Sequence, residues 1–209
     1  SATLIVVALI LIVVYRSPLL WIFPLLSAVI ALTFAGSAVY LLAKEEIITL
    51  NGQAQGILSV LVIGAATDYG LLLIARYREE LHLVESRFTA MRKAIRGVFE
   101  PVVASGATVS VGLLVLLLSE LDANRSLGPV GAIGVVVAVL TMLTLLPALL
   151  VLFGRWVFWP RIPHFDSKDE KLSGLWAKVA KYVDKKTKRA GLITGILLLA
   201  LAGYSTQLD

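Results

Sequence analysis

The chain has 209 residues, of which 58% are hydrophobic, and its mean hydropathy is +0.89. These values lie well beyond those of an ordinary soluble domain and indicate a membrane protein rather than a soluble helical bundle. The net charge of +5 comes from Lys and Arg gathered in a few loops, so we infer no nucleic-acid binding from it. Cysteine is absent, which excludes disulfides, cysteine-based metal sites and a thiol nucleophile.

Six runs with little or no charge predict transmembrane helices, because about 20 helical residues cross roughly 30 Å of hydrocarbon. In chain order they are residues 1–15, 18–43, 56–75, 101–119, 128–154 and 190–204. The four central runs are long enough to span a bilayer, whereas the two outer runs are short. We therefore interpret Ser1 as an artificial boundary and the last run as a span cut where it leaves the membrane. The predicted fold class is all-α, a polytopic transmembrane helix bundle.

The distribution of basic residues predicts the orientation of the chain. The loops around Arg16, at residues 76–100 and at residues 155–189 together carry 17 of the 19 Lys and Arg residues. Only Lys44 and Arg125 fall on the other side. Because short loops rich in Lys and Arg stay in the cytoplasm, we expect the first set to be cytoplasmic and both chain ends to lie outside. The predicted location is the inner (plasma) membrane, as a multi-pass protein.

Two of the basic loops carry amphipathic helical patterns. In residues 76–100 apolar side chains recur at spacings of three and four, which predicts a helix along the inner membrane surface. Residues 154–189 begin with aromatics that suit the headgroup layer and continue as an amphipathic basic helix at 172–188. Contact of this helix with anionic lipids and a solvated linker helix whose charges only set the topology are both open interpretations. The predicted divisions are residues 1–153, the linker 154–189, and residues 190–209.

Asp68 is the one acidic residue inside an uncharged apolar run. A carboxylate near the bilayer centre costs at least about 2.5 kcal/mol, so it normally faces a protein interior or a water pathway and marks proton or ion movement. Gly64 lies one turn earlier on the same helix face, where small residues let a second helix approach. We expect Asp68 to point into such a seam, and Tyr69, about 100° round the helix, to reach an adjacent helix. A permanently protonated carboxyl group bonded to a helix carbonyl is the structural alternative.

The two following spans supply hydroxyl groups that could line this seam. Ser105 and Thr108 share a helix face at a spacing of three, although hydroxyls in membrane helices often bond back to their own carbonyls. The spans contain no Lys or Arg, so a charge partner for Asp68 must come from residues outside this sequence. His82 and His164 have no second ligand at metal-binding spacing, so we expect no metal site and no cofactor.

The string Gly64-x-x-x-Asp68-Tyr69, followed by Arg76-Tyr-Arg-Glu-Glu80, resembles the MMPL transporters, the mycobacterial membrane protein large family of the RND superfamily. Tyr15-Arg-Ser-Pro18, Glu100-Pro101 and the long inner connection after the sixth span look similar as well, so the resemblance covers nearly the whole chain. It implies a twelve-span, proton-driven exporter of lipids or lipid-like hydrophobic molecules. Two pseudo-symmetric halves of such a protein carry large porter domains outside the membrane.

By this resemblance the chain corresponds to the first half, with spans two to six in residues 1–153 and span seven in residues 190–209. Asp68 and Tyr69 would form half of a proton relay, facing a second Asp-Tyr pair on span ten, with Gly64, Ser105 and Thr108 as candidate lining residues. No second Asp-Tyr dipeptide occurs in this sequence. The implied partners are therefore the second half of the transporter, the porter domains, membrane lipids and, as in some related pumps, further copies. A dimer of half-sized proteins is the alternative.

Two other functional classes fit part of the sequence. A sterol-sensing-like membrane binding or regulatory module shares the helical core of this superfamily and need not transport anything, and a lack of proton dependence would favour it. An intramembrane aspartyl protease needs two catalytic aspartates in neighbouring spans. The apolar runs offer only Asp68 and lack a Gly-x-Gly-Asp string. We therefore expect a proton-motive-force-driven exporter and no enzyme.

Overall fold

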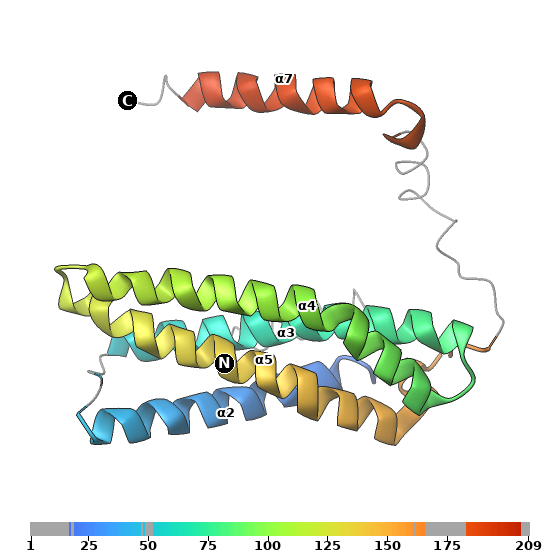
Figure 1. The fold of residues 1–209 in the computed structure, drawn as a ribbon, viewed down its shortest axis with the longest axis horizontal. Helices are drawn as coiled ribbons and strands as arrows, with labels where there is room; N and C mark the ends of the chain where they lie inside the picture. The colour runs from blue at the N-terminus through green and yellow to red at the C-terminus, as the bar shows by residue number, and fades with distance from the viewer. Residues whose placement is uncertain are drawn as a thin grey trace. The chain divides into compact units, whose positions relative to one another are not determined.

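The computed structural model describes residue 17 and residues 19–46, 48, 52–160, 162–165 and 183–205. These residues form helices joined by short connections (Figure 1). The helices are α2 (Ile22–Lys44), α3 (Gly52–Leu83), α4 (Arg87–Leu114), α5 (Asp122–Phe153) and α7 (Thr187–Ser205), with 3-10 turns at Val115–Leu118 and Gly154–Phe158. The chain divides into two compact units, Ser1–Ser167 and Lys168–Asp209.

Helices α2 to α5 lie side by side in the first unit and form a bundle (Figure 1). Helix α5 packs against the other three, and α3 does the same. The close approach of α5 to α3 depends on Gly134, because a Cβ atom there would lie 2.6 Å from Leu58 Cδ1 and 2.8 Å from Val62 Cγ2. Small residues at such crossings let membrane helices pack backbone to backbone.

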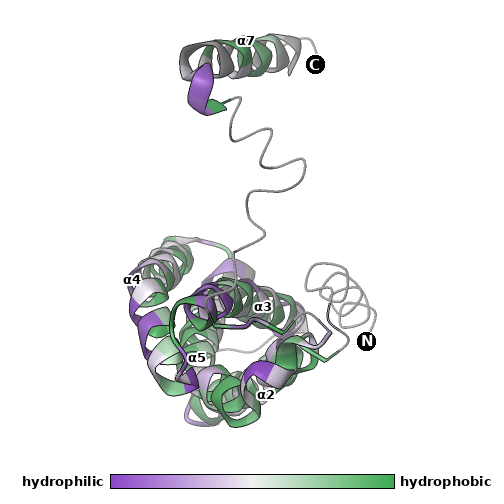
Figure 2. Cartoon of the chain, turned by 90° about the vertical axis from the view of Figure 1, so that its right-hand side faces the viewer, coloured by the Kyte–Doolittle hydropathy of each residue, from purple (hydrophilic) through white to green (hydrophobic). Residues whose placement is uncertain are grey.

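Four of the described helices are long and apolar enough to cross a membrane: Ile22–Lys44, Gly52–Leu83, Arg87–Leu118 and Asn124–Phe158. Their apolar residues are not confined to the core, since Phe34, Leu140 and Leu152 are each more than half exposed. Figure 2 shows hydrophobic residues along α2 and α5. Hydrocarbon rather than water suits such a surface. The prediction of a polytopic transmembrane bundle is confirmed for these four spans, while the run at residues 1–15 lies outside the described residues.

Helix α7, in the second unit, begins at Thr187, close to the boundary at residue 190 predicted from the sequence. Its apolar part among the described residues, Gly191–Ala200, is shorter than the roughly 20 residues that a spanning helix needs. A seventh span therefore stays a prediction. The basic helix expected at residues 172–188 lies mostly outside the described residues.

The prediction of a single surface helix over residues 76–100 is wrong. Helix α3 continues to Leu83 and α4 begins at Arg87, so the segment is the end of one bundle helix and the start of the next. Ser86 caps α4, because its hydroxyl accepts a hydrogen bond from the Thr89 amide at 3.5 Å. Leu81 and Met91, two of the apolar positions behind the prediction, are buried in the bundle core. The apolar periodicity is real, but its stripe packs against protein rather than lipid.

Arg155 joins the end of α3 to the segment that follows α5. Its guanidinium donates to the carbonyl oxygens of Leu81 at 2.9 Å, Val84 at 2.8 Å and Glu85 at 3.0 Å. It also donates to the Pro163 carbonyl at 2.6 Å. A positive charge is favourable at the C-terminal end of a helix, where the last carbonyl groups have no partner within the helix. The side chain thus fixes the end of the helix that carries Asp68.

Candidate functional site

Asp68 lies on a stripe of α3 that no described helix covers. The stripe runs along one face at spacings of four residues, through Val60, Gly64, Asp68 and Leu72. Asp68 is exposed, as are Val60 and Leu72, and Gly64 is half-buried. A Cβ atom added at Gly64 would meet no heavy atom within 4 Å. The described residues therefore do not supply the second wall of the seam expected at Asp68, and that wall stays a prediction.

The opposite face of α3 is tightly packed only two residues from Asp68. A Cβ atom at Gly70 would lie 3.2 Å from Pro24 Cβ on α2 and 3.3 Å from Leu146 Cδ2 on α5. Thr67 is buried beside it and donates its hydroxyl to the carbonyl oxygens of Ile63 at 2.8 Å and Gly64 at 2.9 Å. This packing holds the α3 backbone in place and leaves Asp68 directed away from α2 and α5.

Tyr69 connects the stripe to α4, as its position on the helix led us to expect. Its hydroxyl oxygen lies 3.5 Å from Ser105 Oγ, and either group can act as the donor. Gly106, next to Ser105, lets α4 approach α5, because a Cβ atom there would lie only 2.7 Å from Val139 Cγ2, whereas its distance of 3.8 Å from the Tyr69 hydroxyl would be an ordinary contact. Two of the predicted site residues, Tyr69 and Ser105, are thus brought together between α3 and α4.

Thr108 is not part of this contact. Its hydroxyl donates to the Ala104 carbonyl of its own helix at 2.8 Å, and its side chain is exposed. Such back-bonding satisfies the hydroxyl locally and makes no link between helices. Of the two hydroxyl residues predicted to line the seam, only Ser105 therefore reaches another element among the described residues.

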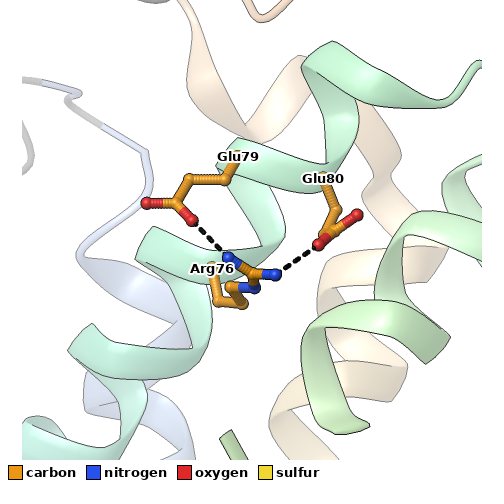
Figure 3. A network of polar contacts seen from close by, with 3 residues as sticks. All are labelled: Arg76, Glu79 and Glu80. Carbon is orange, nitrogen blue, oxygen red and sulfur yellow. Dashed lines mark hydrogen bonds and ion pairs between the residues drawn. The ribbon is translucent and has the colours of Figure 1, made fainter. Parts of the chain in front are cut away.

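Arg76 lies two helical turns beyond Asp68 and is held by acidic neighbours (Figure 3). Its guanidinium pairs with Glu79 at 2.8 Å and with Glu80 at 2.8 Å. The Glu80 side chain is only 5% exposed, whereas the Arg76 side chain is 44% exposed, so the carboxylate is buried and the guanidinium remains partly in contact with solvent. Arg76 also packs over Gly97 of α4, where a Cβ atom would lie 3.1 Å from its Nε. The arginine is therefore directed toward its own acidic neighbours rather than toward Asp68.

From the sequence, the string from Arg76 to Glu80 was noted only as part of a family motif, and the ion pairs within it were missed. The signal was available, because opposite charges three and four residues apart lie next to each other on a helix. Arg155 was missed as well. Its partners are main-chain carbonyl groups, which every residue has, so no sequence pattern indicates them.

The described residues provide no evident centre for metal chemistry. Among them, no group of three or more His, Asp or Glu side chains lies close enough together to hold a metal ion. None of them donates a hydrogen bond to the Asp68 carboxylate either. What the arrangement offers is a single carboxyl group on an open helix face, next to a tyrosine that reaches the neighbouring helix.

The sequence matches the MMPL family over residues 1–189. It is 50% identical over 207 residues to "Putative membrane protein ActII-3" of Streptomyces coelicolor, an alignment that covers 99% of this chain and 29% of the relative. It is 39% identical over 189 residues to the apo-petrobactin exporter of Bacillus anthracis, covering 90% and 25%. The acyltrehalose exporter MmpL10 of Mycobacterium tuberculosis is 32% identical over 120 residues, covering 57% and 12%. The chain thus spans less than a third of the length of these relatives.

Proposed function

This chain belongs to the MMPL family, and we propose that it forms part of the transmembrane core of a proton-motive-force-driven exporter of lipids or lipid-like hydrophobic molecules. Relatives are named as exporters of apo-petrobactin and of acyltrehalose, which supports export as the general activity and makes an enzymatic role unnecessary. Asp68 and Tyr69 are half of the proton relay in this proposal.

The main support for the proposal is the difference between the two faces of α3 around Asp68. Helix α3 is packed on the side of Gly70, whereas no described helix covers the side of Gly64 and Asp68. A carboxyl group facing lipid at this depth would be costly, so it calls for a partner surface or a water pathway. We propose that the second half of the transporter, with its own Asp-Tyr pair, covers the stripe. Gly64 would admit the backbone of the covering helix.

The chemical step assigned to Asp68 is the gain and loss of one proton. A proton from the outer side neutralises the carboxylate, which removes the cost of burying its charge and lets the two halves repack. A membrane potential of 100 mV contributes about 2.3 kcal/mol for each charge moved across it, comparable to the energy of a few buried polar contacts. Because Tyr69 lies against Ser105, a shift at Asp68 is passed directly to α4.

The rest of the assembly is part of the same proposal. The basic loops face the cytoplasm, which places the ends of α3 and α5 at the inner surface and the connection between α2 and α3 at the outer surface. Porter domains outside the membrane and, for some arrangements, further copies of the protein complete the export path. Substrate contacts lie in those domains and at the outer ends of the spans.

The test is export by the complete parent protein, comparing wild type with Asp68→Asn at matched membrane expression. Asparagine retains the shape of the side chain and removes its titration, so we expect export driven by an imposed proton gradient to fall to background. Glu46→Gln is the control, because it removes an exposed carboxyl group at the end of α2 and should leave export unchanged. Export by Asp68→Asn with its proton dependence intact would contradict the proposal and favour a regulatory module that binds without transport.

A further inference from the structure

Helices α2 and α3 leave a hollow between them at the end of the bundle far from Arg76. Its volume is about 490 Å³, which is within the range of small-molecule sites. Each helix contributes four lining residues. They are Leu32, Gly36, Val39 and Tyr40 of α2, and Gly52, Gln55, Leu58 and Ser59 of α3.

Two glycines account for the empty space. A Cβ atom added at Gly36 or at Gly52 would meet no heavy atom within 4 Å. This is the reverse of Gly134, where the missing side chain is what lets two helices touch. Glycine also costs about 0.8–1.0 kcal/mol relative to alanine inside a helix. At Gly36, a helix-weakening residue is therefore found where a larger one would fit and would fill the hollow.

The chemistry of the walls changes along the hollow. Leu32, Val39 and Leu58 make its sides apolar, and the last two belong to the bundle core. The Tyr40 hydroxyl and the Gln55 amide lie toward the ends of their helices nearest the α2–α3 connection, and Tyr40 is 63% exposed. An aromatic residue with a polar tip is typical of the membrane–water interface. A ligand with an apolar chain and a polar group at one end matches this change from apolar to polar lining residues.

The hollow is separate from the proton site although both use α3. At about 100° per residue, Ser59 lies about 180° round the helix from Asp68. Gly52 and Gln55 lie about 140–160° from Asp68 in the same way, whereas Leu58 lies about 80° from it, so three of the four α3 residues that line the hollow are on the far side of the helix from Asp68.

We propose that this hollow binds the acyl chain of the transported substrate, with the substrate's polar group held at Tyr40 and Gln55 before export. The inference rests on the proposed function, and it assigns the substrate of the exporter a binding site and a chemical class. Acyl chains are the medium around membrane-spanning helices, and the mainly apolar walls of the hollow suit them.

The experiment uses the complete parent protein in vesicles that contain a phosphatidylethanolamine with a photoreactive diazirine in its acyl chain. After illumination, mass spectrometry locates the labelled residues, and we expect them on the walls of the hollow, at Leu32, Val39 or Leu58. Gly36→Leu adds a side chain to the wall of the hollow at a position where a Cβ atom meets no heavy atom within 4 Å, and labelling there should fall at least about tenfold, equivalent to about 1.4 kcal/mol. Gly52→Leu is a second filling variant, should the first fail to insert.

Ser37→Leu is the matched control. It adds the same side chain to the next residue of α2, on its exposed side, where the native hydroxyl only bonds back to the Thr33 carbonyl at 2.8 Å. We expect both labelling and export to survive in this variant and both to be lost in Gly36→Leu. Absence of labelling on the walls would overturn the proposal. Loss of labelling with normal export in Gly36→Leu would overturn it as well, because the hollow would then hold bulk lipid.

Asp68→Asn separates this proposal from the proposed function. The variant should retain acyl-chain labelling while export stops, because Asp68 does not line the hollow. Normal export by Asp68→Asn would remove the proton-relay assignment. The labelling and export of Gly36→Leu would still decide whether the hollow is a substrate site.

Discussion

The two faces of α3 on either side of Asp68 are built in different ways. On the inward face, Gly70, Leu73 and Tyr77 are buried against other helices of the same chain. On the outward stripe, Gly64 has free space around it and Asp68 and Leu72 are exposed. The inward face therefore specifies how this chain folds, whereas the outward stripe has a polar group without a described partner. Substitutions on the two faces should separate stability from export.

The largest effect is expected on the packed side, at Gly134. A leucine there would overlap Leu58 and Val62, since even a Cβ atom would come within 2.6 Å of Leu58. Overpacking of this kind costs typically 1–3 kcal/mol, and for a change from glycine to leucine we expect about 3 kcal/mol. The measurement is the thermal stability of the purified parent protein in detergent. An unchanged melting temperature would show that α5 and α3 lie farther apart than described.

The counterpart on the open stripe is Gly64→Leu. With no heavy atom within 4 Å of the new Cβ, the side chain has room in this chain, and the melting temperature should stay the same or rise slightly. Export should nevertheless fall at least about tenfold, because leucine would keep the covering helix away from Asp68. Export and the melting temperature are measured on the same preparations, so that a loss of export can be separated from a loss of stability. Normal export by Gly64→Leu would mean that no helix seats on this stripe.

The sequence predicted the four central spans because their length and lack of charge are imposed by the thickness of the bilayer. It misplaced their ends. Helix α3 starts at Gly52 and continues to Leu83, since polar residues beyond the hydrocarbon still extend a helix. The segment at 76–100 was misassigned because a stripe that packs against protein has the same period as one that packs against lipid.

The candidate site was predictable in part. A lone acidic residue in an apolar run identifies Asp68, and helix geometry indicated that Tyr69 reaches a neighbouring helix. The choice of Ser105 over Thr108 as its contact depends on how α3 and α4 cross, which no local pattern encodes. The main-chain contacts of Arg155 and the open space at Gly36 likewise arise from tertiary packing alone.

A smaller effect is expected for Tyr69→Phe, which tests the link between the stripe and α4. The oxygen–oxygen distance of 3.5 Å to Ser105 is long for a hydroxyl pair, so its loss should cost less than about 1 kcal/mol of stability. If the hydroxyl acts through Ser105, then Tyr69→Phe and Ser105→Ala should reduce export to the same extent, and the double variant should be no worse than either. A larger defect in Tyr69→Phe alone would mean that the hydroxyl acts on Asp68 or on the missing half instead.

The smallest effect is expected for Thr108→Val, the control that makes the Ser105 result interpretable. Valine has nearly the same shape as threonine, and the hydroxyl that it removes bonds only to the Ala104 carbonyl of its own helix. Exposed substitutions that break no tertiary contact usually change stability by less than about 0.5 kcal/mol, so we expect normal stability and normal export. Export measured beside Ser105→Ala then tells whether the seam uses hydroxyl groups in general or one contact in particular. A strong defect in Thr108→Val would place the covering helix over Thr108 and extend the functional surface from α3 onto the open side of α4.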